Sequence, residues 1–324
     1  MPTELLATCW THAGDAMPVD GHHLSPVDLR VRAEAVAAAG FTGIGFTIGD
    51  LDAALATHGL PQIRQICDDL GLVHREVELL EDWWTTGALR RASDQVRASL
   101  LNAAAALGAR TVKIGPDVRA VDGVVPPLTD VEHWAAELHQ LAVEAAEAGT
   151  RVALEPLPFA NITDFRVAAD LVAAADHPAA GLVVDIWHLE RGPSTLADLA
   201  EVPGDKVFVV ELNDAPVPQS ADLFQDTIHH RVLCGAGTFD VRGFVETLRR
   251  IGFAGPWGVE IISDTHRQGP LLKALTDAYR TTMDVFDDAA AQSRQATRTC
   301  PAPDVQQVPT PASRREASSA DTDT

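Results

Sequence analysis

The sequence predicts an α/β protein, a (β/α)₈ barrel built from eight strand–helix units. Short apolar segments alternate with longer Ala/Leu-rich amphipathic segments along almost the whole chain, which is typical of proteins with a parallel sheet. The apolar segments are continuous, as in VVD and FVVE, so both faces of each strand should be covered. Eight repeats favour closure into a barrel over an open, doubly wound sheet.

The expected strands are eight short apolar segments, and the expected helices lie between them. The strands are predicted at 5–10, 43–48, 73–79, 111–114, 151–155, 181–185, 207–211 and 257–262. The helices are predicted near 26–39, 50–70, 91–108, 130–148, 164–175, 195–200, 239–251 and 268–287. Ser25 is the expected N-cap of the first helix, Pro26 its first residue, and Gly40 follows its end.

The domain organisation is expected to be simple, with one barrel over residues 1–287. From Asp288 the composition changes to Ser, Thr, Pro, Gln and Asp, and no Phe, Trp or Tyr follows. A segment of this composition cannot bury enough apolar surface to fold. Residues 288–324 are therefore predicted to form a disordered tail.

Composition and charge exclude several classes of partner. The 324 residues include 25 Lys and Arg against 46 Asp and Glu, a formal charge of -21 that repels a phosphate backbone, so no nucleic-acid partner is expected. No apolar segment approaches the roughly 20 residues that span a bilayer, and the N-terminus lacks the basic region of a signal peptide. The four cysteines are scattered and form no CxxC pair, which fits the reducing cytoplasm.

The most informative feature is a ring of acids at the ends of the last four expected strands. The segments RVALE, GLVVD, KVFVVE and GPWGVE end on Glu155, Asp185, Glu211 and Glu260. An acid at the carboxyl end of a barrel strand faces the active-site mouth. Any one of them can instead cap the following helix, but four in succession make capping a poor general explanation.

Convergence of these acids implies a cation. Two carboxylates about 4 Å apart repel by roughly 4 kcal/mol at an effective dielectric constant of 20, so the cluster must be neutralised. Protonation or a bound ion can do this. A set of oxygen ligands favours a hard ion such as Mg²⁺ or Mn²⁺ over Zn²⁺.

Several short motifs resemble those of the sugar isomerase/epimerase superfamily of xylose-isomerase-like TIM barrels. They are LEPLP at 154–158, VDIWH at 184–188, ELND at 211–214, RVLCGAGTFD at 231–240 and GVEI at 258–261. Each motif is weak alone, but their order and their positions at strand ends make the set specific. The resemblance covers residues 1 to about 287 and implies one divalent metal ion, with Mn²⁺ or Mg²⁺ expected.

The resemblance also implies roles for individual acids. The positions of Glu155, Asp185 and Glu260 bind the metal in that family, and the seventh-strand position is commonly His, where this chain has Glu211. Glu211 adds a negative charge, which weakens the case for zinc and makes it the least secure ligand. By the same resemblance, Glu155 and Glu260 lie on opposite sides of the substrate and exchange acid and base roles.

Two further side chains are expected beside the acids. Arg231 resembles a residue that binds a substrate hydroxyl, carbonyl or carboxylate, although an ion pair with Asp226 is the alternative. The family usually has Pro where this chain has Cys234, but the Gly-x-Gly after it can still form a tight turn. His188, three residues after Asp185, is expected to donate a proton or bind substrate, with helix capping or packing as the alternative.

Other candidates have weaker support. Lys113 lies inside an apolar strand and is expected to balance the acids or to hold a substrate oxygen, because a buried lysine is costly unless paired. Trp10 and His12 are expected to contact a sugar face or to pack in the core. His230 is expected to bind substrate or to lie on the surface. Two further tryptophans, Trp83 and Trp84, are expected to line the cleft or the interface of a homo-oligomer.

These features favour a metal-dependent isomerase or epimerase that acts on a small polyhydroxylated carbonyl substrate, such as a keto-sugar or cyclitol, through an enediolate. The same intermediate can lose a β-substituent, so a lyase is the alternative. Inosose dehydratases, dehydroshikimate dehydratases and C-glycoside-cleaving enzymes resemble this barrel too. The fold alone does not choose between them.

Two more distant alternatives remain. A DNA-repair endonuclease also resembles this barrel, but it requires several zinc ions, more histidine ligands and a basic groove, and the charge of -21 opposes it. A non-catalytic sugar-binding subunit is disfavoured because the acids are retained.

Overall fold

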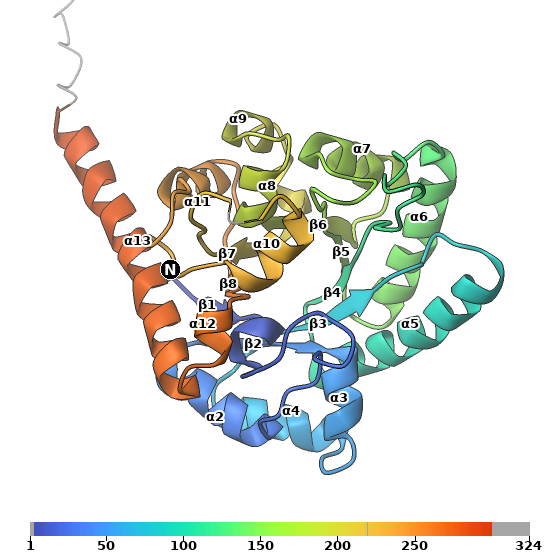
Figure 1. Cartoon of the computed structure of the whole chain (residues 1–324), viewed down its shortest axis with the longest axis horizontal. Helices are drawn as coiled ribbons and strands as arrows, with labels where there is room; N and C mark the ends of the chain where they lie inside the picture. The colour runs from blue at the N-terminus through green and yellow to red at the C-terminus, as the bar shows by residue number, and fades with distance from the viewer. Residues whose placement is uncertain (1–2, 219, 300–324) are drawn as a thin grey trace, which may run out of the picture.

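The fold is a closed barrel, as the sequence predicts. The computed structural model describes residues 3–218 and 220–299, and within them eight parallel strands are hydrogen-bonded in chain order, with β8 beside β1 (Figure 1). The strands are β1 Leu5–Ala7, β2 Gly43–Thr47, β3 His74–Leu80, β4 Thr111–Ile114, β5 Val152–Leu154, β6 Ala180–Asp185, β7 Val207–Leu212 and β8 Trp257–Val259. Almost every strand residue is buried, because helices cover the barrel outside and side chains fill it inside.

Helices surround the barrel, and several short ones follow strand ends at its mouth (Figure 1). They are α1 Cys9–His12, α2 Leu29–Ala39, α3 Ile48–Ala54, α4 Leu60–Asp69, α5 Gly87–Leu107, α6 Val131–Glu147, α7 Phe165–Ala175, α8 Ile186–Arg191, α9 Leu196–Leu199, α10 Leu223–His229, α11 Val241–Arg250, α12 Asp264–Arg267 and α13 Leu271–Thr299, with a 3₁₀ turn, η1, at Gly204–Lys206. Helix α13 packs beside α2 and α11 and so joins the first and last units of the barrel.

Two predicted helix boundaries are wrong. The first helix begins at Leu29, because the Asp28 carboxylate accepts hydrogen bonds from the backbone N–H groups of Arg30 and Val31 and caps the helix there. The segment 50–70 forms two helices, since α3 ends near Ala54 and α4 begins after Gly59. A side-chain cap sets the first boundary, whereas Gly59 and a proline in the first turn mark the start of α4.

The last helix continues through the expected domain boundary at residue 287. Helix α13 continues to Thr299, beyond the limit of 287 that the composition predicts. Residues 300–324 lie outside the described residues, so the disorder expected for them stays a prediction. In the part of the chain that is described, no helix is long and apolar enough to cross a membrane.

Candidate active site

Four carboxylates meet at the mouth of the barrel. Glu155 follows β5, Asp185 ends β6, Glu211 lies near the end of β7 and Glu260 follows β8. Each offers one oxygen, and these four oxygens lie within 4.8 Å of one another. They converge because neighbouring parallel strands end at the same level, with Asp185 directly opposite Glu211. The structure therefore brings together all four acids singled out in the sequence.

Asp185 is held by three donors. Its Oδ1 accepts hydrogen bonds from Asn213 Nδ2 at 2.8 Å and from the backbone N–H of Trp187 at 2.7 Å. Its Oδ2 accepts a 2.7 Å hydrogen bond from Arg231 Nη1. Burial opposes ionisation, but the Arg231 guanidinium, His188 and the hydrogen bonds together outweigh it and hold the pKa of Asp185 below its ordinary value. Asp185 also caps α8, so one side chain both caps a helix and belongs to the acid cluster.

Arg231 is anchored at its far side and points its guanidinium at the acids. Its Nε and Nη2 donate to Thr227 Oγ1 at 3.0 and 2.9 Å, while Nη1 also lies 3.1 Å from Glu260 Oε2. The guanidinium carbon lies 5.6 Å from the centre of a Trp187 ring. Arg231 is almost fully buried yet borders the large cavity at the mouth of the barrel. It is thus one of two cations that balance the acid cluster.

His188 stands beside Glu155. Its Nε2 lies 3.1 Å from Glu155 Oε1 and 3.6 Å from Asp185 Oδ2, and its ring is buried. Burial would raise the pKa of Glu155, but the hydrogen bond from His188 and the electrostatic effects of His188 and Lys113 together lower it below its ordinary value. Glu155 is therefore ionised at neutral pH.

The other two acids are shifted in the opposite direction. Burial raises the pKa of Glu260 to about 8, even though Lys113 and Arg231 act to lower it. Burial and the neighbouring Glu260 raise the pKa of Glu211 well above its ordinary value. One cluster thus holds ionised and protonated carboxyl groups side by side, a pattern that marks acid and base partners in enzymes.

Lys113 is the second cation of the site. It is 1% exposed, forms ion pairs with Glu211 and Glu78, and lies 3.5 Å from Glu76 Oε1. Burial disfavours its charge, but the surrounding acids outweigh burial and raise its pKa well above the ordinary value. Lys113 therefore lies where it balances the acids, and it also borders the cavity at the mouth of the barrel.

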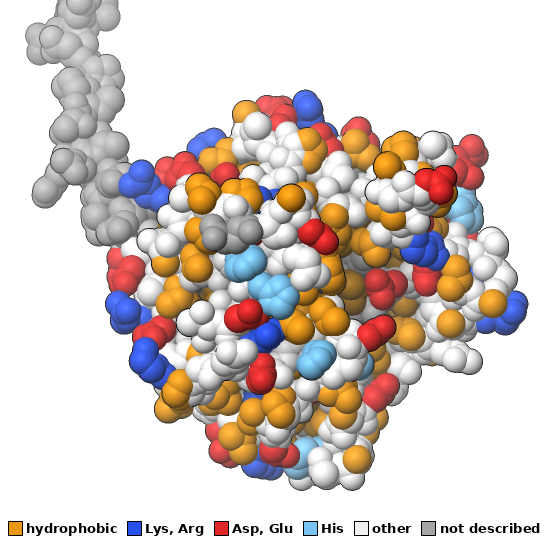
Figure 2. All heavy atoms as spheres, in the orientation of Figure 1, with side chains coloured by type: hydrophobic (Ala, Val, Ile, Leu, Met, Phe, Trp, Pro, Cys, Tyr) orange, Lys and Arg blue, Asp and Glu red, His pale blue; other side chains and the backbone are white. Residues whose placement is uncertain are grey.

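A cavity of about 990 Å³ opens above the acids. Glu155, His188, Lys113, Arg231 and Glu260 border it on the polar side. Much of the remaining lining is apolar and includes Phe159 and Phe224, together with Val118, Ala120 and residues 123–125 of the loop between β4 and α6. This face of the molecule is visibly hollowed, and hydrophobic and acidic side chains border the hollow (Figure 2). The cavity can enclose a small polyhydroxylated molecule with space remaining.

The weaker candidates divide between the cavity and the surrounding protein. Trp10 borders the cavity, as expected. His12 does not, because it is fully buried with Nε2 2.8 Å from the carbonyl oxygen of Gly45 and Nδ1 3.4 Å from Arg32. His230 lies at the end of α10, 3.5 Å from Asp226, and is also absent from the cavity wall.

Both interpretations of Trp83 and Trp84 are wrong. The two indoles are buried against each other and against Trp134 of α6, with Trp84 and Trp134 stacked 4.2 Å apart between ring centres. Trp83 Nε1 donates a 2.8 Å hydrogen bond to the carbonyl oxygen of Gly115. These tryptophans therefore form part of the outer core and are available neither to substrate nor to a second subunit.

The loop that carries Arg231 is organised by one carboxylate. Asp214 accepts hydrogen bonds from the backbone N–H groups of four residues, which are Ala215, Gly235, Gly237 and Phe239. A Cβ at Gly237 would lie 2.2 Å from Asp214 Oδ1, so the turn requires glycine there. Cys234 is buried in the same loop, with Thr282 Oγ1 3.5 Å from its sulfur. Asp214 thus organises the turn although the proline usual in the family is absent.

Sequence reasoning missed two acids of the site. Glu76 and Glu78 lie on β3, two residues apart, and both contact Lys113 inside the barrel. The motif HREVELL carried the signal, because acids at alternate positions of a strand share one face. The single buried lysine on the next strand indicates which way that face points.

The residues present fit a divalent cation. Ligands on opposite sides of one ion are about 4 to 5 Å apart for the metal–oxygen distances of Mg²⁺ and Ca²⁺, which matches the 4.8 Å limit of the four-acid cluster. Glu211 Oε2 is buried and has no hydrogen-bond partner among the described residues. A cation would satisfy this oxygen and reduce the repulsion among the acids.

Known proteins with similar sequences include enzymes. A 3-dehydroshikimate dehydratase from Pseudomonas putida is 31% identical over 263 residues, which are 78% of this chain and 39% of that protein. An inosose isomerase from Bacillus subtilis is 27% identical over 150 residues, which are 46% of this chain and 53% of that protein. The chain thus spans between about two fifths and one half of the length of these relatives.

Solved structures show the same fold. A xylose isomerase-like TIM barrel/4-hydroxyphenylpyruvate dioxygenase fusion protein superposes with a TM-score of 0.77 at 25% identity, covering 97% of this chain and 47% of the other. The IOLI protein with a bound zinc atom has a TM-score of 0.74 at 19% identity, covering 89% and 99%. Residues 33–289 match the family described as xylose isomerase-like TIM barrel. With the closed eight-stranded barrel and the acids at its mouth, this match means that the chain belongs to that family.

Proposed function

We propose that the chain is a divalent-metal-dependent isomerase or epimerase that moves a proton at a carbon next to a carbonyl group, through an enediolate. The observation that carries this proposal is the convergence of four carboxylates at the mouth of the barrel, with Glu155 and Glu260 both bordering the large cavity. Before a metal ion binds, the pKa of Glu155 is lowered and that of Glu260 is raised to about 8, so the two carboxyl groups hold their protons with different strength.

Each neighbouring residue has a task in this reaction. Glu155 removes the carbon-bound proton while its hydrogen bond with His188 keeps the carboxylate ionised and oriented. Glu260 returns a proton from the other side. Arg231, fixed by Thr227, offers its guanidinium at the cavity wall to an oxygen of the substrate.

Glu155, Asp185, Glu211 and Glu260 would hold the metal ion. When bound there, the ion would polarise the substrate carbonyl and stabilise negative charge on its oxygen. Four carboxylates are hard ligands and favour Mn²⁺ or Mg²⁺. The zinc atom of the related IOLI protein belongs to a structure 19% identical to this chain and does not decide which metal this chain uses.

The substrate class that fits best is a cyclic polyhydroxylated ketone. The two related enzymes are named for dehydroshikimate and inosose, which are both six-membered carbocycles that carry a ketone and at least two hydroxyl groups. Such a molecule offers a carbonyl to the acid cluster and an acidic carbon-bound proton to Glu155. The cavity of about 990 Å³ accommodates it.

Dehydration is a second candidate, and one observation favours it. The dehydratase aligns over 78% of this chain, whereas the isomerase aligns over 46%. In this reaction Glu155 would remove the carbon-bound proton, and the enediolate would then expel a β-hydroxyl group, which leaves as water after accepting a proton from His188. The two reactions share their first step and differ in the fate of the enediolate.

Nuclear magnetic resonance in D₂O separates the two reactions. Dehydroshikimate, inososes and keto-sugars are incubated with the protein and Mn²⁺, and deuterium at carbon is followed together with new products. Incorporation with an isomeric product supports the isomerase, and loss of water supports the dehydratase. Glu155→Gln and Glu260→Gln should lower turnover at least 100-fold, while Glu201→Gln at the exposed end of α9 serves as the control. Full turnover in both variants would refute the acid and base assignment.

A further inference from the structure

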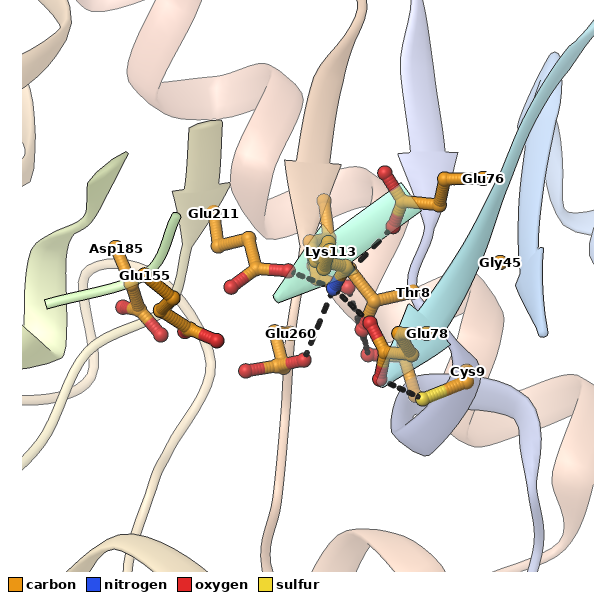
Figure 3. Close-up of polar contacts among 12 residues, drawn as sticks. Thr8, Cys9, Gly45, Glu76, Glu78, Lys113, Glu155, Asp185, Glu211 and Glu260 are labelled. Carbon is orange, nitrogen blue, oxygen red and sulfur yellow. Dashed lines mark hydrogen bonds and ion pairs between the residues drawn. The ribbon is translucent and has the colours of Figure 1, made fainter. Parts of the chain in front are cut away.

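A second group of buried acids adjoins the four-acid cluster and shares one member with it. Glu76 and Glu78 on β3 and Glu211 on β7 each offer an oxygen within 4.8 Å of the others. All three side chains are buried. Figure 3 shows Glu211 between the two groups, with Asp185 and Glu155 on one side and Glu76 and Glu78 on the other. Two sets of cation ligands thus lie side by side in one barrel.

The two groups differ in what lies between their carboxylates. The ammonium of Lys113 is placed among all three acids of the second group, paired with Glu78 and Glu211 and 3.5 Å from Glu76 (Figure 3). It also lies 3.9 Å from Glu260 Oε1. An ammonium has three protons to donate, one for each acid of the group. The second group is therefore already neutralised in part by the chain itself.

The surrounding strands make room for this arrangement. A Cβ at Gly45 of β2 would lie 3.1 Å from Glu76 Oε1 and 3.2 Å from its Cγ. A Cβ at Gly258 of β8 would lie 3.4 Å from Glu211 Cγ. The thiol of Cys9 donates to Glu78 Oε1 at 2.6 Å and fixes that carboxylate. Barrel interiors usually contain packed aliphatic side chains, so this layer of charged side chains departs from the usual packing of a barrel.

We propose that Lys113 acts as an internal cation that fills the second acid group and restricts the barrel to one divalent metal ion. Without the ammonium, Glu76, Glu78 and Glu211 would form an uncompensated buried set of oxygen ligands, which binds a hard divalent cation. Glu211 would then bridge two ions. The inference rests on the metal site of the proposed function and assigns Lys113 a role in determining how many ions that site holds.

Metal stoichiometry tests this role without any substrate. Protein stripped with a chelator is titrated with Mn²⁺, and bound Mn²⁺ per chain is measured by elemental analysis after desalting. The wild-type chain should bind one ion, and Lys113→Ala should bind two. Lys273→Ala removes an exposed lysine from α13 and should still bind one ion. In Lys113→Ala the electron paramagnetic resonance spectrum should show two Mn²⁺ ions coupled to each other.

A second variant covers the case in which Lys113→Ala does not fold in the absence of metal. The double variant Lys113→Met, Glu76→Gln removes one positive and one negative charge together and keeps the side-chain lengths similar. It should fold without metal and bind one ion, because a second ion has lost a carboxylate ligand.

The outcomes separate this inference from the proposed function. One ion in the wild type and two in Lys113→Ala supports it, and the same two ions are expected if Lys113→Ala folds only with Mn²⁺, while one ion in the double variant identifies Glu76 as a ligand of the second ion. One ion in both the wild type and Lys113→Ala overturns the inference and leaves the metal site intact. Two ions in the wild type also overturn it. Absence of binding in the wild type overturns the metal site itself and the inference with it.

Discussion

Arg231 donates a 2.7 Å hydrogen bond from Nη1 to Oδ2 of Asp185 in a fully buried position. The same nitrogen lies 3.1 Å from Glu260. A buried guanidinium therefore joins two members of the acid cluster before any ligand binds. It also borders the cavity, so the group that stabilises the acids is the group that a substrate oxygen can reach.

Replacing this guanidinium should be costly. In Arg231→Met two buried carboxyl groups lose their partner, and the free energy of unfolding should fall by about 3–5 kcal/mol. Urea denaturation measures the change. Saturating Mn²⁺ should restore part of the loss, because a metal ion supplies positive charge at the same place. Arg250→Met, at the exposed end of α11, should change stability by less than about 0.5 kcal/mol, and an equal loss in both variants would contradict the prediction.

Metal binding should raise thermal stability. An ion that binds only the folded chain adds about 2.7 kcal/mol at a concentration 100 times its dissociation constant, so Mn²⁺ should raise the melting temperature by several degrees. Asp185→Asn should lose most of this rise and still fold, because asparagine also caps helices well. Asp164→Asn at the exposed cap of α7 is the matched control. The same rise in Asp185→Asn and wild type would remove Asp185 from the ligand set.

The stability of the fold should depend on His12 at acid pH. Burial and the neighbouring Arg32 lower the pKa of His12 from 6.5 to about 4, so between these values the unfolded chain binds a proton that the folded chain does not. The contribution is fully present above pH 6.5 and is lost as the pH falls to about 4, up to about 3 kcal/mol.

Urea denaturation between pH 7 and pH 4 measures this dependence on the His12 proton. The fall in the free energy of unfolding should be shallower in His12→Gln than in the wild type. His23→Gln, in an exposed loop, should keep the wild-type dependence. Parallel curves for His12→Gln and wild type would show that another group controls acid unfolding.

The carboxylate of Asp214 should stabilise both the loop and ligand binding. Asp214→Asn replaces two acceptor oxygens by one, so some of the four amides lose their partner and stability should fall by at least about 2 kcal/mol. Affinity for ligands should fall as well, because the loop positions Arg231. Asp240→Asn, at the cap of α11 just after the loop, keeps a side-chain acceptor and should be nearly neutral. Calorimetry measures the loss of stability, and ligand titration measures the loss of affinity. Wild-type affinity in Asp214→Asn would contradict the expected effect on ligand binding.

The position of the four-acid cluster could be predicted from the sequence for a simple physical reason. In a parallel barrel every strand reaches the same rim with its carboxyl end, so acids that end successive apolar segments must meet there. Asp185 and Glu211 confirm this, because they are direct neighbours in the register of β6 and β7. For both side chains, the position at the rim follows from the strand segment that carries it.

Other parts of the site depend on closure of the barrel and could not be predicted in the same way. Glu76 and Glu78 alternate with apolar residues, a pattern that usually indicates a strand with one face in water. Only closure turns that face inward, onto Lys113. Of the two positions expected for His12, the structure shows packing in the core, since β1 ends at Ala7 and the chain turns at once into α1, away from the cavity.

The loop between β4 and α6 borders the cavity through Val118, Ala120 and residues 123–125, while the acids lie on or directly after strands β5 to β8. Directed evolution of this chain can therefore randomise the loop to change which molecules enter, without disturbing the groups that perform the chemistry. Val121 and Val124 are mostly exposed and join only through a short bridge, so libraries at this tip should retain a high fraction of folded variants. New substrate ranges should be reached there sooner than by substitution in the barrel wall.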